Sequence, residues 1–113
     1  MKNIKLLEKF DYLVYLDADS YVYSKISEKE FFSNNKNLFS VQHPYFVNKI
    51  GTFDDNKKSL AYVSDKEDKK IYWQACFWGG ETNSVIKMVE ELNKRVDRDL
   101  SKKIMAKWHD ESY

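Results

Sequence analysis

The chain has 113 residues, of which 16% are aromatic and 33% charged, and its formal net charge is +1. Such a length forms about one domain, and a charge this close to zero indicates no polybasic surface, so we expect no nucleic-acid partner. One cysteine excludes an intrachain disulfide framework, no Cys/His cluster has the spacing of a zinc site, and no stretch approaches the length of a membrane span. We therefore expect a soluble α/β piece of one domain.

An apolar run from Tyr12 to Leu16 follows a stretch of helical spacing at residues 3–9 and ends abruptly in Asp17-Ala18-Asp19. The run lacks polar alternation, which is typical of a parallel strand covered on both faces. Ligands of open α/β sheets bind beyond the carboxyl ends of the strands. Because residues i and i+2 of an extended chain point to one side, Asp17 and Asp19 are expected to share a cation such as Mg²⁺ or Mn²⁺ with substrate phosphates. A polar turn is the alternative interpretation.

The middle of the chain alternates apolar and polar segments. Residues 27–32 are expected to form a short helix or loop, capped by the serine at its start and followed by acidic residues that suit a helix N-terminus. Residues 38–41 predict an apolar strand, and the proline that follows His43 favours extended geometry there. Residues 51–70 are polar and charge-rich around a short strand-like segment at 60–63.

The segment 71–78 is apolar and aromatic and ends in Gly79-Gly80, which permits positive φ or close backbone approach. A helix is predicted next, with Asn83 or Ser84 as its cap. Apolar residues repeat there at intervals of three and four, which gives one buried stripe. The stripe consists of Val85, Met88, Val89, Leu92 and Val96.

The last cluster of chemical interest is Trp108-His109-Asp110-Glu111-Ser112. An indole face stacks on the apolar face of a pyranose, while carboxylates bind hydroxyls or stabilise positive charge at an anomeric carbon. The cluster therefore suits sugar chemistry. A solvated turn or helix end is the alternative interpretation.

Taken together, these segments resemble glycosyltransferase family 6, which includes the histo-blood-group A and B transferases, the α-1,3-galactosyltransferases and bacterial relatives. The resemblance covers nearly the whole chain. It implies a GT-A fold with a mixed sheet flanked by helices, a UDP-Gal or UDP-GalNAc donor, and retaining transfer in α-1,3 linkage to a galactoside acceptor. Five blocks carry it in the family's order and approximate spacing: residues 11–19, His43-Pro44-Tyr45-Phe46, Ser59-Leu60-Ala61-Tyr62, residues 72–80, and residues 108–112.

The resemblance implies a metal site and a catalytic carboxylate. Asp17 and Asp19 match the DxD motif, which grips the UDP diphosphate through Mn²⁺, and the metal would offset the charge on the departing UDP. Glu111 matches the proposed nucleophile, which either forms a covalent intermediate or supports an oxocarbenium-like transition state. Asp110 matches a neighbour that contacts donor or acceptor hydroxyls.

The resemblance also implies sugar-binding residues. His43 and Trp108 match positions that contact the acceptor, and His109 matches a site residue to which we assign no role; a buried structural histidine is the alternative for both imidazoles. Gln74, Ala75 and Cys76 fall where the family sorts donors. Because Cys76 is larger than glycine, it favours Gal over GalNAc, although a small buried hydrophobe is the alternative interpretation.

Two departures from the family pattern affect the expected acceptor pocket: Tyr45 stands where a small residue is typical, and Lys57 replaces the usual proline. Residues 1–113 resemble the middle of a catalytic domain, without the preceding uridine-binding part and the carboxyl-terminal tail. A sheet without its neighbouring strands exposes apolar edges. We therefore expect this piece alone to be poorly folded or inactive.

Two other functions compete with a transferase. One is a non-catalytic fragment that binds a sugar or a partner protein. The other is a haloacid-dehalogenase-type phosphatase, in which Asp17 would be the nucleophile and Asp19 the acid. Against the phosphatase, Tyr21 stands where that pattern needs a small Thr or Val, and no later Gly-Asp-x-x-x-Asp motif follows.

Overall fold

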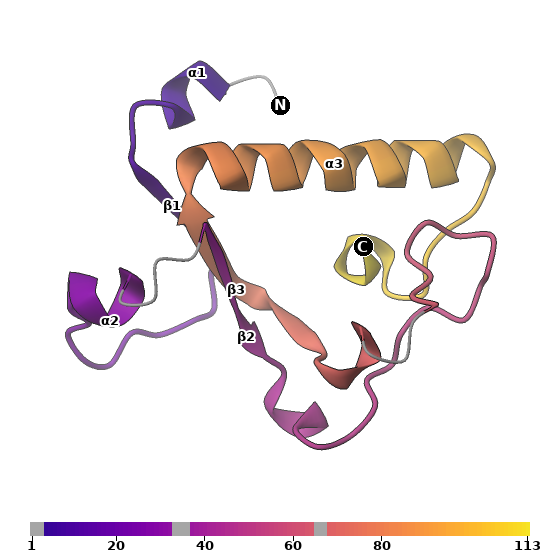
Figure 1. Cartoon of the computed structure of the whole chain (residues 1–113), viewed down its shortest axis with the longest axis horizontal. Coiled ribbons are helices and arrows are strands. Elements are labelled where there is room, and N and C mark those ends of the chain that lie inside the picture. The colour runs from indigo at the N-terminus through magenta and orange to yellow at the C-terminus, as the bar shows by residue number, and fades with distance from the viewer. Residues whose placement is uncertain (1–3, 33–36, 65–67) are drawn as a thin grey trace.

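The computed structural model describes residues 4–32, 37–64 and 68–113, apart from the side chains of Phe31, Phe32, Asp68, Asp110 and Glu111. Its centre is an antiparallel sheet of three strands in the order β1-β3-β2 (Figure 1). Strand β1 is Tyr12–Leu16, β2 is Leu38–Gln42 and β3 is Trp73–Glu81. The longest strand, β3, therefore lies between the other two.

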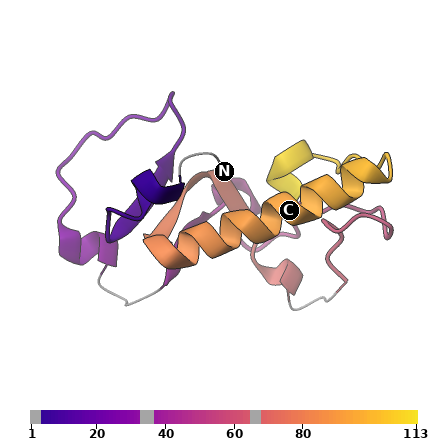
Figure 2. The same cartoon turned by 90° about the horizontal axis from the view of Figure 1, so that it is seen from above.

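In the described residues, three α-helices accompany the sheet: α1 at Ile4–Leu7, α2 at Glu28–Phe32 and α3 at Thr82–Ser101. Helix α3 starts where β3 ends and leads away from the sheet, and the C-terminal turn lies beside its second half in both views (Figures 1 and 2). Short 3₁₀ helices occupy Pro44–Phe46, Asp68–Lys70 and His109–Ser112. In the ranges that the structure describes, no helix is long and apolar enough to span a bilayer.

The predicted start of the helix at 27–32 is confirmed, and its cap is a local one. The Ser27 hydroxyl accepts a hydrogen bond from the Glu30 amide, and the Glu30 carboxylate accepts from the Ser27 amide and hydroxyl at 2.7 Å each. This reciprocal arrangement is a capping box, which satisfies free N–H groups at a helix start. The hydrogen bonds from Ser27, its backbone amide first, lower the pKa of Glu30 below its ordinary value.

The predicted helix after the glycine pair is also confirmed, but its predicted cap is wrong. Helix α3 begins at Thr82, ahead of Asn83 and Ser84, and the N-cap residue Glu81 makes no side-chain cap. Instead, the Thr82 amide donates to the Asp11 carbonyl at 3.0 Å and the Thr82 hydroxyl to the Phe10 carbonyl. The start of α3 is therefore fixed by the chain entering β1, which local helix chemistry does not reveal.

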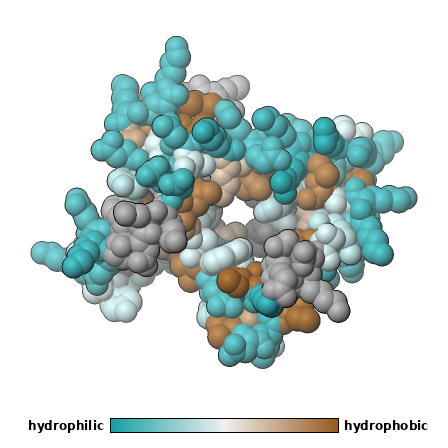
Figure 3. Space-filling model, viewed as in Figure 1, coloured by the Kyte–Doolittle hydropathy of each residue, from teal (hydrophilic) through white to brown (hydrophobic). Residues whose placement is uncertain are grey.

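The predicted apolar stripe of α3 faces the interior only in part. Val85 and the neighbouring Ile86 are buried, whereas Met88, Val89, Leu92 and Val96 are half-buried. The other buried apolar side chains of the described ranges are Ala61 and Ala106, which lie outside the sheet. The core is small, and in the space-filling view brown side chains adjoin a central hollow between the sheet and the C-terminal part (Figure 3).

Gly79 and Gly80 lie within β3 rather than ending it, and the predicted close backbone approach is confirmed. A Cβ atom on Gly79 would lie 2.4 Å from the Leu13 carbonyl oxygen, and one on Gly80 would lie 2.0 Å from the Asn37 carbonyl oxygen. Gly80 also has a φ of 153°. The glycines therefore let both neighbouring chains approach the centre of the sheet.

Two expectations about the sheet are wrong. Strand β1 pairs antiparallel with β3, as β2 does, so the described sheet is antiparallel and not mixed. Strand β1 is also not covered on both faces, since Val14, Tyr15 and Leu16 are 45, 45 and 42% exposed. Antiparallel pairing needs no crossover helix, and such helices are what cover the faces of parallel strands, so β1 stays partly open to solvent.

The prediction of a strand-like segment at residues 60–63 is also wrong. These residues form a turn, and an isolated bridge joins Asp54 and Tyr62. The Leu60 amide donates to the Asp99 carboxylate at 2.8 Å, and the Ala61 amide donates to the Ser59 hydroxyl at 3.0 Å. These backbone amides therefore donate to side chains and not to a neighbouring strand.

Candidate functional site

A bulge in β3 carries the three residues predicted to sort donors. Ser40 of β2 pairs with Trp78, but the next residue, Val41, pairs with Gln74, so the register between β2 and β3 jumps at residues 75–77. The Ser40 hydroxyl lies 3.5 and 3.4 Å from the carbonyl oxygens at the two ends of the bulge. Bulges re-aim side chains and are frequent beside active sites. Ala75 and Cys76 therefore stand where the ladder is broken.

The predicted metal motif lies directly across from this bulge. Strand β1 follows β3 as far as the pair Leu16 and Phe77, and the Asp17 amide then donates to the Cys76 carbonyl at 3.1 Å. The Tyr15 hydroxyl donates to Oδ1 of Asp17 at 2.7 Å. The structure thus brings together Asp17 and Cys76, which the family resemblance assigns to the metal and to the donor sugar.

The prediction that Asp17 and Asp19 point to one side of an extended chain is wrong, because the backbone after Leu16 is not extended. The Ser20 amide donates to the Asp17 carbonyl at 3.0 Å, which closes a β-turn around Ala18 and Asp19. Asp17 is half-buried and Asp19 is exposed. Within residues 4–32, 37–64 and 68–113, these carboxylates form no group of three or more metal-ligating side chains.

A second group of predicted residues surrounds Thr52. The Trp108 indole N–H donates to both the carbonyl and the hydroxyl oxygen of Thr52, at 3.0 and 3.1 Å. The Thr52 hydroxyl in turn donates to the Tyr72 hydroxyl at 3.3 Å. Trp108 is 47% exposed. Since its N–H is engaged, the indole offers its ring to solvent or to a ligand.

His43 joins this group through aromatic rings. Its ring lies 4.9 Å from that of Phe46 and 6.0 Å from that of Tyr72, and its amide donates to the Tyr72 carbonyl at 2.7 Å. Its Nδ1 accepts from the Tyr45 amide at 3.2 Å, so Nε2 is the nitrogen left to meet a ligand. His43 has φ −62° and ψ 118°, which confirms the extended geometry predicted before a proline. Both predicted acceptor residues are thus linked through Tyr72.

The C-terminal residues form one turn. The Trp108 amide donates to the Ser112 hydroxyl at 2.9 Å, and the His109 amide donates to the Ala106 carbonyl at 3.0 Å. His109 is exposed with a φ of 55°, so it is not the buried structural histidine of the alternative. The side chains of Asp110 and Glu111 lie outside the described part of the structure. Their backbone belongs to the 3₁₀ helix that begins at His109.

Strand β3 connects the two groups of predicted residues. Tyr72 directly precedes β3 and belongs to the group around Thr52, whereas Cys76 lies four residues further, across from Asp17. At about 3.3 Å per residue, the two positions are about 13 Å apart along the strand. The predicted donor and acceptor regions are therefore neighbours on one element.

Two buried carboxylates anchor this region, and sequence patterns single out neither. Asp54 is 4% exposed; its Oδ1 accepts from the Asn56 amide and its Oδ2 from the Lys107 amide, both at 2.7 Å. Asp99 is fully buried, and its Oδ2 accepts from Ser59, Leu60 and Tyr113 at 2.7 to 2.8 Å.

The sequence holds weak signals for both anchors. Asp99 continues the spacing of the α3 stripe after Leu92 and Val96, so its carboxylate stands where the pattern requires an apolar residue. Asp54 and Asn56 have the spacing of an Asx turn. No local pattern marks Thr52, whose role depends on a tryptophan 56 residues later.

The Asp99 carboxyl group and the Tyr113 phenol at this anchor both have shifted pKa values. Burial raises the pKa of Asp99. Hydrogen bonds from Ser59, Leu60 and Tyr113, together with the charge of Lys102, lower this pKa by more than burial raises it, so the net shift is downward. Burial and the hydrogen bond to Asp99 raise the pKa of Tyr113. At neutral pH the pair is therefore a carboxylate with a neutral phenol donor.

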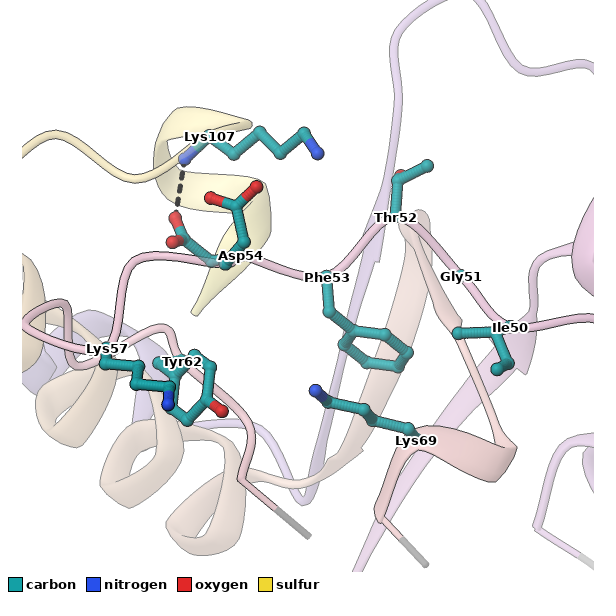
Figure 4. Close-up of a pocket in the computed structure, with 10 residues that line it drawn as sticks. Ile50, Gly51, Thr52, Phe53, Asp54, Lys57, Tyr62, Lys69 and Lys107 are labelled. Atoms are coloured by element: carbon teal, nitrogen blue, oxygen red, sulfur yellow. Dashed lines mark hydrogen bonds between the residues drawn. The ribbon is translucent and has the colours of Figure 1, made fainter. Parts of the chain in front are cut away.

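An open cleft of about 520 Å³ lies beside the Thr52 group (Figure 4). The Lys69 ammonium lies 5.9 Å from the ring centre of Phe53 and 5.2 Å from that of Tyr62. Thr52 itself lines the cleft, so the cleft continues from the Trp108 contact. The lining consists of Ile50, Gly51, Thr52, Phe53, Asp54, Asp55, Lys57, Tyr62, Lys69 and Lys107.

Comparison with known proteins identifies the family. The family model described as glycosyltransferase family 6 matches residues 2–113. The chain is also 31% identical over 116 residues to the O-antigen biosynthesis glycosyltransferase WbnI of Escherichia coli. This match includes 100% of the chain and 48% of the relative, so the chain spans about half the length of the curated relative. The chain belongs to glycosyltransferase family 6, which favours the transferase interpretation over the phosphatase one.

Proposed function

We propose that the protein containing this chain is a retaining hexosyltransferase of the GT-A fold. It transfers Gal, in preference to GalNAc, from a UDP-sugar to a galactoside in α-1,3 linkage. Family membership supports this proposal, together with one observation about the site. Asp17 lies next to Cys76 of β3, and the start of β3 adjoins the group that contains Trp108 and His43. The E. coli relative is named for O-antigen biosynthesis, and we propose an oligosaccharide acceptor here also.

The donor end of the site is built from Asp17, Asp19 and Cys76. The two carboxylates come from one turn and suit a hard divalent ion such as Mn²⁺, which when bound offsets the negative charge of the diphosphate. Tyr15 holds one oxygen of Asp17, so the carboxylate has a fixed orientation. Cys76 stands in the β3 bulge, where its side chain limits the space for a 2-acetamido group.

The acceptor end of the site is built from Trp108, Thr52 and His43. Thr52 occupies the indole N–H, so Trp108 contributes a ring face on which a pyranose stacks. His43 keeps Nε2 for a sugar hydroxyl because Nδ1 is engaged by the Tyr45 amide. We assign Glu111 as the carboxylate that supports the anomeric carbon and Asp110 as a hydroxyl ligand. The open cleft leaves room for the rest of an acceptor.

The test is release of UDP from UDP-Gal and UDP-GalNAc, with and without Mn²⁺, by the protein that contains this chain. We expect release that depends on Mn²⁺, that is faster with UDP-Gal, and that is lost in Asp19→Asn and Glu111→Gln. Asp11→Asn and Glu90→Gln are matched controls, since both carboxylates are exposed and lie outside the proposed site.

Each result bears on a different part of the proposal. Equal release without Mn²⁺ would contradict the metal role of Asp17 and Asp19. A folded sample that releases no UDP would contradict transferase activity and favour a non-catalytic sugar-binding protein. Faster release from UDP-GalNAc would contradict the donor preference.

A further inference from the structure

The Trp108-to-Ser112 turn is held at both ends by buried carboxylates from other parts of the chain. Directly before the turn, the Lys107 amide donates to Oδ2 of Asp54 at 2.7 Å. Directly after it, the Tyr113 hydroxyl donates to Oδ2 of Asp99 at 2.8 Å. The turn itself is closed by the hydrogen bond from the Trp108 amide to Ser112.

Asp99 joins this turn to the loop that carries Thr52. Its Oδ2 also accepts from the Ser59 hydroxyl at 2.7 Å and from the Leu60 amide at 2.8 Å. One oxygen atom of helix α3 therefore gathers donors from two segments that lie far apart in sequence. Those two segments meet again where Trp108 donates to Thr52.

The form of this anchor points to placement of the C-terminal turn in addition to stability. Asp99 is completely buried, with 0% relative exposure. Its Oδ1 has no hydrogen-bond partner in the described part of the chain. A buried carboxylate with one unpaired oxygen is a costly source of stability, because desolvation opposes it. Three charge-assisted hydrogen bonds to one oxygen do, however, fix the donors in space.

We propose that Asp99 is a positioning residue for sugar transfer, acting through Tyr113 and Ser59 to hold the turn that carries Trp108 and Glu111 against the Thr52 loop. This inference rests on the proposed transferase function. Displacement of a catalytic group by about 1 Å can cost about 100-fold in rate. Loss of the anchor should therefore lower kcat more than it weakens donor binding, which takes place at the other end of the site.

Tyr113→Phe tests the inference, because it removes the hydroxyl that reaches Asp99 and keeps the ring. Thr82→Val is the matched control: it removes a hydroxyl that holds the other end of α3 to Phe10. We would measure kcat and donor KM in the protein that contains this chain, and the indole N–H resonance of Trp108 by ¹H–¹⁵N NMR. In Tyr113→Phe we expect a fall in kcat of at least fivefold, a KM within twofold, and a shifted Trp108 resonance.

The control separates positioning from general stability. Thr82→Val should lower the melting temperature while leaving kcat within twofold and the Trp108 resonance in place. Asp99→Asn is a second variant that keeps the shape of the side chain but weakens its hydrogen bonds, and it should act in the same direction as Tyr113→Phe.

Unchanged kcat and an unchanged Trp108 resonance in both anchor variants would overturn the inference. If the wild-type chain transfers no sugar, the proposed function fails, and the NMR measurement still decides whether Asp99 and Tyr113 hold the turn at Thr52. A resonance that shifts equally in Thr82→Val would also overturn the inference, because the effect would then be one of stability.

Discussion

The hydroxyl of Tyr15 donates a 2.7 Å hydrogen bond to Oδ1 of Asp17, the first carboxylate of the Asp17-Ala18-Asp19 turn. The ring of Tyr15 is stacked on Trp78 of β3, with ring centres 5.1 Å apart. The sheet therefore fixes the phenol, and the phenol fixes the carboxylate. This relationship orients a proposed metal ligand before any cation binds, since groups that hold a ligand in place strongly affect metal affinity.

Tyr15→Phe should weaken Mn²⁺ binding about tenfold, because the hydrogen bond that orients Asp17 is lost while the stacking ring remains. Titration calorimetry of Mn²⁺ with the full chain measures this change. Tyr21→Phe is the matched control, since Tyr21 is 85% exposed and should bind Mn²⁺ as the wild type does. An unchanged Mn²⁺ affinity in Tyr15→Phe would show that this hydrogen bond does not orient the ligand.

Cys76→Gly should shift the donor preference toward UDP-GalNAc. Removing the thiol group from the β3 bulge leaves room for an acetamido substituent, and one group of this size changes discrimination about tenfold or more. The quantity to measure is the ratio of kcat/KM for UDP-GalNAc to that for UDP-Gal. Ser40→Ala, which removes the hydroxyl at the two ends of the same bulge without changing Cys76, is the control. A ratio that is unchanged in Cys76→Gly, or equally changed in both variants, would contradict the donor role of Cys76.

The elements that sequence patterns predicted correctly depend on residues close together in the chain. Ser27 and Glu30 form their capping box within one turn of α2, and the repeat of apolar residues predicted α3. The errors concern partners that are distant in sequence. The start of α3 is set by Phe10 and Asp11, and the antiparallel pairing of β1 depends on β3, more than 50 residues later.

The candidate site shows the same division. Trp108, His43 and the two aspartates stand out because of their residue types and their blocks. Thr52 and Asp99 are ordinary polar residues in the sequence, and their importance comes from hydrogen bonds to Trp108 and Tyr113. The register break at Cys76 likewise depends on the pairing of β3 with β2, so a single strand pattern does not reveal it.

Gly80→Ala should destabilise the fold by about 2 kcal/mol or more, because a Cβ atom there meets the Asn37 carbonyl oxygen at 2.0 Å and the backbone has a φ of 153°. Chemical denaturation measures the loss. Glu81→Ala, at the next position of the same strand, is the control: Glu81 is exposed and makes no cap, so its removal should cost little. Equal stability of Gly80→Ala and the wild type would show that β2 and β3 can move apart at low cost.

The buried anchor predicts a pH dependence of stability. Burial raises the pKa of Asp99, but hydrogen bonds from Ser59, Leu60 and Tyr113 lower it to a net value below that of the unfolded chain. A group with a lowered pKa in the folded state stabilises the protein above its unfolded pKa, about 3.9 for aspartate, and this stabilisation is lost as the pH falls through the folded value. The anchor should therefore be fully effective at neutral pH and fail in acid.

Asp99→Asn separates this contribution from that of the other carboxylates. At pH 7 it should lower the free energy of unfolding by about 2 kcal/mol, as expected for weakened hydrogen bonds to a buried charge. The difference from wild type should narrow steadily as denaturation is repeated below about pH 4. Ser59→Ala removes one hydrogen-bond donor and keeps the carboxylate. Its difference from wild type in the free energy of unfolding should be smaller than that of Asp99→Asn, and it should decrease over the same pH range. A difference for Asp99→Asn that stays constant from pH 7 to pH 3 would mean that the Asp99 carboxylate has the same pKa in the folded and unfolded chains.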